Sequence, residues 1–154
     1  MLPSGPLFLR PLSALRVVFL GFGLTFASLP ATAQTADVAV EVPADALQQL
    51  LSVCVDAQAC TAAINALLAT LQSLNPGVPV ATLIGSIAAE VIASYNDGAV
   101  PSAVAANVLS SAATSATSNG ATTLANSLAQ AATTAASGAA VDAAAVAQGT
   151  ASPG

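Results

Sequence analysis

The chain has 154 residues, 55 % of them hydrophobic and only 6 % charged, with seven acids, two bases and no histidine. Both bases, Arg10 and Arg16, stand near the N-terminus, so the rest of the chain has no cation for phosphate groups, and nucleic acid is excluded as a partner. With no histidine and only two cysteines, we expect neither a metal site nor a cofactor.

Residues 1–33 have the pattern of a secretory signal peptide, in which basic residues precede an apolar run, Val17–Leu29. Ala31 and Ala33 occupy the small-residue positions that come before a cleavage site, so we expect cleavage between Ala33 and Gln34. The apolar run is shorter than the roughly 20 residues that span a bilayer as a helix. The alternative is an uncleaved N-terminal anchor. We predict a periplasmic or secreted bacterial protein that meets the membrane only through this leader, before cleavage.

Cleavage would leave a chain with no Lys, Arg, His, Trp, Phe or Met. Its side-chain charge would be −7, and no salt bridge between side chains could form within it. An acidic field attracts cations, so we expect a cationic protein partner or self-association. The seven acids are Asp37, Glu41, Asp45, Asp56, Glu90, Asp97 and Asp142.

Residues 34–42 are predicted to be an extended linker. A first helix should begin at Pro43, because proline suits the first helical position, and Asp45 in the first turn favours the helix dipole. Its apolar stripe comprises Leu47, Leu50, Leu51 and Cys54.

Cys54 and Cys60 are the only cysteines, and an exported protein favours a disulfide between them. On one continuous helix they would lie about 9 Å apart along the axis and about 240° around it. Because a disulfide needs Cα atoms within about 7 Å, the helix must break between them, and Asp56 can cap the next helix. A zinc site would need more ligands, and a redox pair normally has two residues between its cysteines.

A second helix is predicted over Ala57–Leu74, ended by Asn75–Gly77, where Pro76 cannot continue a helix. A third should begin at Pro79 and close at Asn96–Gly98. Both have apolar residues at intervals of three and four, which places each set on one helix face. The sets are Ile64, Leu67, Leu68, Leu71 and Leu74, then Val80, Leu83, Ile84, Ile87, Val91 and Tyr95.

Pro101 can open a fourth helix that ends near Asn119–Gly120, and a fifth, weaker helix is predicted from Ala121 to Ser137. The prediction is therefore an all-α fold, an irregular bundle of four to five short helices over residues 43–137. Since alanine buries little area, the Ala-rich part 99–137 should be weaker than 43–98. Residues 138–154 are expected to form a low-complexity, Ala-rich, flexible tail.

The sequence contains few side chains that could act as a catalytic acid, base or nucleophile. Glu90 is a candidate for a desolvated carboxylate with a raised pKa, but it stands off the main stripe of the third helix and should face water. The many Ser and Thr residues lack a base to activate them. We therefore expect no enzyme activity.

Two adjacent eleven-residue units, Ala121–Ala131 and Ala132–Asp142, place Thr122 over Thr133 and Thr123 over Thr134. Eleven residues come close to three helical turns, so the threonines share a face. This resembles the alanine-rich, threonine-spaced helices of type I antifreeze proteins, and the resemblance implies binding to ice or to another surface.

The function expected from the sequence is that of an exported, small helical structural or protein-interaction protein without catalytic activity. One alternative is a helical binding module for a small apolar ligand, and another is the ice- or surface-binding helix.

Overall fold

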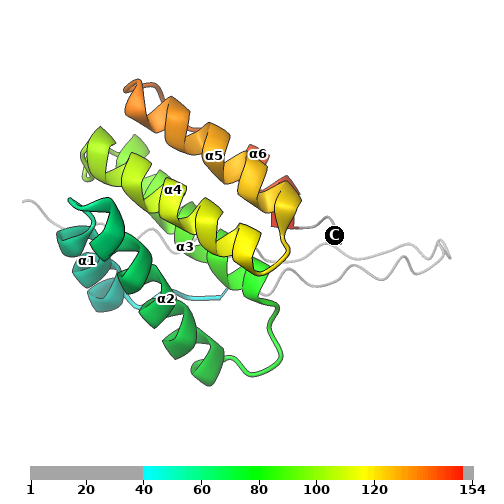
Figure 1. The fold of residues 1–154 in the computed structure, drawn as a ribbon. Coiled ribbons are helices and arrows are strands. Elements are labelled where there is room, and N and C mark those ends of the chain that lie inside the picture. The colour runs from blue at the N-terminus through cyan, green and yellow to red at the C-terminus, as the bar shows by residue number, and fades with distance from the viewer. Residues whose placement is uncertain (1–39, 151–154) are drawn as a thin grey trace, which may run out of the picture. The chain divides into compact units, whose positions relative to one another are not determined.

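Six α-helices follow one another along residues 40–150, the part of the chain that the computed structural model describes (Figure 1). They are α1 (Ala44–Val53), α2 (Ala57–Leu74), α3 (Val80–Asn96), α4 (Ser102–Ser118), α5 (Thr122–Ala136) and α6 (Ala143–Thr150). These residues include no strand, so the all-α prediction is confirmed. The predicted leader, its cleavage site between Ala33 and Gln34, and residues 34–39 of the predicted linker lie outside the described residues.

Local signals set the helix ends. Pro43, Pro79 and Pro101 each stand at the N-cap, one position before the first helical residue. After α3 and α4 the chain turns through Gly98 and Gly120, whose φ angles of 75° and 78° lie in the left-handed region that favours glycine. The prolines and glycines of the sequence thus predict most of the helix boundaries.

The third helix lies at the centre of the core. Its buried residues come from both sides of the predicted stripe, because α3 contacts α2, α4, α5 and α6. The fully buried side chains include Leu83, Ile84, Ile87, Val91 and Ile92. Burying each of these aliphatic side chains stabilises the fold by about 1.5–3 kcal/mol.

The most extensive helix contact joins α4 and α5, which lie side by side (Figure 1). Alanines make much of it: Ala112 and Ala116 on α4 are buried, as are Ala125 and Ala132 on α5. Small side chains let two helix backbones approach closely. Each alanine buries little area, but the close approach creates many contacts, and their number compensates for the small area of each.

Within residues 40–150 the predicted count of four to five helices is corrected to six, because α6 forms within the segment expected to be a flexible tail. Val141 and Val146 are buried, and α6 contacts α3 and α5. Gly149 permits a close approach, since a Cβ atom there would lie 2.9 Å from the Cα atom of Leu124. This packing joins residues far apart in the sequence.

The end of α3 holds the segment that leads into α6. The Tyr95 hydroxyl, with its single proton, lies within hydrogen-bond distance of two carbonyls, that of Ala139 at 3.0 Å and that of Ala135 at 3.3 Å. The Asn96 side-chain amide donates to the Val141 carbonyl at 2.9 Å and accepts from the Val141 N–H at 3.0 Å. One asparagine thus satisfies both backbone polar groups of a buried valine.

At the other end, the described part of the predicted linker has no regular secondary structure, yet Val40 and Val42 are buried in the core. The segment just before α1 is therefore packed.

Candidate functional site

The first two helices meet at a tight corner, residues Val53–Asp56. Helix α1 ends at Val53, and the Cys54 N–H donates to the Leu50 carbonyl at 3.1 Å. The Asp56 carboxylate then accepts from the N–H groups of Gln58 and Ala59 at 2.8 and 3.0 Å, which caps α2. The predicted break in the helix is confirmed.

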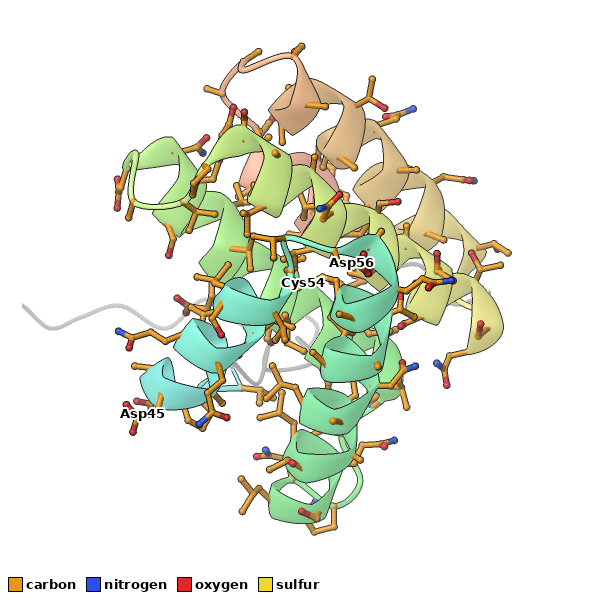
Figure 2. The ribbon with its side chains drawn as sticks, turned by 60° about the vertical axis from the view of Figure 1, so that its left-hand side comes forward. Asp45, Cys54 and Asp56 are labelled. Carbon is orange, nitrogen blue, oxygen red and sulfur yellow. A yellow bond between two sulfur atoms is a disulfide. The ribbon has the colours of Figure 1, made fainter. Side chains whose placement is uncertain are left out.

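A disulfide joins Cys54 to Cys60 across this corner, with their Cα atoms 4.3 Å apart, as the sequence predicted. Both cysteines are fully buried. Figure 2 shows Cys54 and Asp56 at the junction of α1 and α2, with Asp45 at the opposite end of α1.

A third interaction, made by the side chain of Asn107, holds the corner against α4. The Asn107 amide donates to the Cys54 carbonyl at 3.0 Å and approaches the Val55 carbonyl at 3.5 Å. The corner is thus fixed by a covalent bond, a helix cap and a side-chain amide. Few degrees of freedom remain for its backbone.

This corner presents apolar side chains to solvent. Val55 is 74 % exposed and Val53 is 42 % exposed. In the described part of the chain, the other exposed large aliphatic side chain is Leu74, at the end of α2, which the sequence had placed on the apolar stripe. We call Val53, Val55 and Asp56 the corner surface. The corner surface is thus a small apolar surface beside a carboxylate, held in one conformation by the interactions described above.

Polar contacts continue from the corner along the seam between α2 and α4. The Thr61 hydroxyl donates to the Ser111 hydroxyl at 3.2 Å, and Ser111 in turn donates to the Ala57 carbonyl at 3.5 Å. One turn further, the Ser115 hydroxyl donates to the Asn65 side-chain oxygen at 3.0 Å. The residue numbers of the bonded partners increase together along both helices, so α2 and α4 run in the same direction.

A surface hollow of about 510 Å³ opens over this seam. Hydroxyl and amide side chains dominate its lining, which consists of Ala57, Gln58, Thr61, Ser110, Ser111 and Thr114. The buried hydroxyl among them, that of Ser111, already has partners within the protein. Carbon atoms nonetheless make up most of the surface exposed in the hollow, so its lining is mixed in character.

The acidic residues in the described part of the chain lie at exposed positions. Within residues 40–150 all six acids are exposed, and three of them, Glu41, Asp45 and Asp56, fall in the short stretch around α1. Glu90 is exposed on α3, as the sequence predicted. No group of three or more potential metal ligands occurs among the described residues.

The threonines of the eleven-residue units are all on α5, where Thr122, Thr123 and Thr133 are exposed and Thr134 is half-buried. The hydroxyls of Thr133 and Thr134 donate to carbonyls of their own helix at 3.0 Å. Three of the four threonines thus reach solvent.

Sequence reasoning missed the residues that brace the corner from α4. Asn107, Ser111 and Ser115 recur every four residues on a helix that is otherwise rich in apolar residues. That spacing puts polar groups on one face, and it is the signal that could have indicated a polar contact with another helix.

Comparisons with protein-family models, with curated proteins and with solved structures found no match. Within residues 40–150, no helix combines the length and the apolar character needed to cross a bilayer.

Proposed function

We propose that this chain is an exported, non-catalytic helical domain of a bacterial periplasm or exterior, and that it acts by contact with another protein at the corner surface. The observation that carries the proposal is the exposed pair Val53 and Val55 on a corner fixed by a disulfide, a helix cap and Asn107. A surface held rigid in advance loses little conformational entropy when a partner binds.

The charge distribution supports a cationic partner. The three acids around α1 have no basic side chain near them in the sequence, because both arginines belong to the predicted leader. An unbalanced negative field speeds the approach of a positively charged protein and favours it over an acidic one. The valines would then supply the apolar contact once the partner has arrived.

Export is supported by the predicted leader and by the disulfide, since oxidising compartments preserve such bonds. The absence of histidine, and of any lysine or arginine after Arg16, supports a non-catalytic role, because the hydroxyls near the hollow lack a base.

Site-specific crosslinking tests the proposal. A photoreactive residue in place of Val55, in the full chain exported by its own cell, should capture a basic protein. The same residue in place of Ala69, which is exposed on α2, is the matched control. Failure to capture a protein at position 55, or equal capture at both positions, would contradict the proposal.

A second variant tests the role of charge. Asp56→Asn removes the carboxylate and keeps a good helix cap, because asparagine caps about as well as aspartate. We expect capture at position 55 to fall and to lose part of its salt dependence while the helix content stays unchanged. If the amount of protein crosslinked at position 55 and its salt dependence both stay unchanged in Asp56→Asn, the part of the proposal that the partner is cationic is wrong.

A further inference from the structure

The surface hollow between α2 and α4 lies beside the corner surface. Ala57, which lines the hollow, directly follows Asp56, and the Asp56 carboxylate accepts from the N–H of Gln58, another lining residue, at 2.8 Å. Figure 2 shows Asp56 at the start of α2, so its carboxylate stands at the end of the hollow nearest the corner. A partner that covers Val55 therefore meets the hollow next.

The Asp56 carboxylate has one oxygen to spare. Both cap hydrogen bonds, from the N–H groups of Gln58 and Ala59, reach the same oxygen, Oδ1. No residue after Arg16 is a lysine, arginine or histidine, so no side chain of the described part of the chain neutralises the other oxygen, Oδ2. A cation can bind at Oδ2 without displacing the cap, and a hydrogen bond between charged groups is roughly twice as strong as one between neutral groups.

The threonine hydroxyls of the hollow have their protons engaged inside the protein. Thr114 donates to the Ser110 carbonyl at 3.1 Å. Thr61 lies within hydrogen-bond distance of the Ala57 carbonyl, at 3.1 Å, and of the Ser111 hydroxyl, at 3.2 Å. A hydroxyl has one proton and two lone pairs, so the half-buried Thr61 and the exposed Thr114 still offer lone pairs to a ligand.

We propose that the hollow binds an arginine side chain of the partner protein. An arginine only donates hydrogen bonds, carries a positive charge and has an apolar stem. Its guanidinium group suits Asp56 Oδ2 and the threonine lone pairs, and its stem suits the carbon atoms that make up most of the exposed surface of the hollow. The volume, about 510 Å³, lies within the usual range for small-molecule sites, about 300–1,000 Å³. This inference rests on the proposed function, whose partner it describes more closely.

Other occupants fit less well. An anion meets a carboxylate and finds the N–H groups of Gln58 and Ala59 already used. An apolar side chain would remove water from the hydroxyls and give them no hydrogen bond in return. A lysine presents its donors at one point, whereas a guanidinium group spreads five donors over a plane and so reaches acceptors on both α2 and α4.

Nuclear magnetic resonance with a small probe tests the proposal on the processed, oxidised chain. The probe is N-acetyl-arginine N-methylamide, which has one positive charge and no free termini. Its matched control is the same amide of citrulline, which has a neutral urea group in place of the guanidinium. We expect the arginine probe to shift the amide resonances of Gln58, Thr61 and Thr114 along a saturating curve, and the citrulline probe to leave them in place.

Two pairs of variants locate the contact. Asp56→Asn keeps a good cap and should raise the dissociation constant of the probe about threefold to fivefold, the size of an exposed ion pair. Asp45→Asn removes the same charge at the opposite end of α1 and should leave it nearly unchanged. Thr114→Val removes a lone-pair acceptor and should raise the constant about twofold or more. Thr70→Val is the control, because Thr70 is exposed on α2 outside the lining and makes the same hydrogen bond within its helix, at 3.1 Å.

Three results would overturn the inference: shifts spread equally over the exposed acids, an equal response to citrulline, or equal effects of Asp45→Asn and Asp56→Asn. Circular dichroism confirms that each variant is folded. Crosslinking at position 55 judges the proposed function separately. Capture there without an arginine signal in the hollow overturns this inference alone. Arginine binding without capture overturns the proposed function and, with it, the partner protein as the source of the arginine.

Discussion

The contact of α6 with α3 and α5 can be tested by one substitution made at two glycines. In Gly149→Ala, the new Cβ would lie 2.9 Å from the Leu124 Cα and 3.3 Å from its nitrogen, both backbone atoms that cannot rotate away. In Gly85→Ala, the new Cβ would meet the terminal methyl of Thr150, and a rotation of that side chain relieves the contact. The two variants differ in the neighbour that must move.

Two effects of opposite sign determine how much each substitution changes the free energy of unfolding. Replacing glycine by alanine inside a helix stabilises it by up to about 1 kcal/mol, whereas overpacking a well-packed site costs about 1–3 kcal/mol. For Gly149→Ala we expect a net loss of about 1–2 kcal/mol, or about 4 °C of melting temperature for each kcal/mol. For Gly85→Ala the two effects nearly cancel, so the melting temperature should change little or rise.

Thermal unfolding followed by far-ultraviolet circular dichroism measures both values, and the fluorescence of Tyr95 reports on the segment that precedes α6, because its hydroxyl contacts Ala135 and Ala139. Gln148→Ala, at an exposed position of α6, is the control and should leave both signals unchanged. If Gly149→Ala raises the melting temperature, or if Gly85→Ala is the more harmful change, the packing of α6 described above is wrong.

Three further predictions concern other parts of the chain. Asn96→Asp removes the donor to the Val141 carbonyl, so it should cost about 1–3 kcal/mol and speed hydrogen exchange of the Val141 amide, and unchanged exchange would contradict this. Replacing Cys54 and Cys60 by alanine should cost about 2 kcal/mol, while thiol reagents should reduce the buried bond only when the corner opens, which mass spectrometry of the native protein can check. Trypsin should not cleave the exported protein, since both arginines are in the predicted leader, and any tryptic fragment would place the leader boundary elsewhere.

The elements that the sequence predicts well are those with signals within a few residues. Helix α2 spans Ala57–Leu74 as predicted, because the Asp56 cap and the proline after Asn75 act on their immediate neighbours. The corner could be predicted for a similar reason: six residues of continuous helix cannot bring two Cα atoms close enough for a disulfide, and the Asp56 cap placed the break between Cys54 and Cys60.

Helix α6 could not be predicted in this way, because its stability depends on distant partners. Its sequence is rich in small residues, and a helix of eight residues is marginal by itself. Its order comes from Val146 and Gly149 packing against other helices, and from Asn96, which holds Val141 45 positions away. The contacts of Asn107 and Ser111 with the corner likewise join residues more than 50 positions apart.

The polar seam between α2 and α4 has a consequence for how the bundle chooses one arrangement. Aliphatic and alanine side chains recur so regularly on these helices that sliding one helix by a turn would still pair apolar groups with apolar groups. A slip by one turn would place one of the two buried hydroxyls, Ser111 or Ser115, opposite an alanine of α2, Ala57 or Ala69, and so without a side-chain partner. Because the row of polar partners is only two contacts long, it favours one register of two helices whose apolar surfaces alone would allow several.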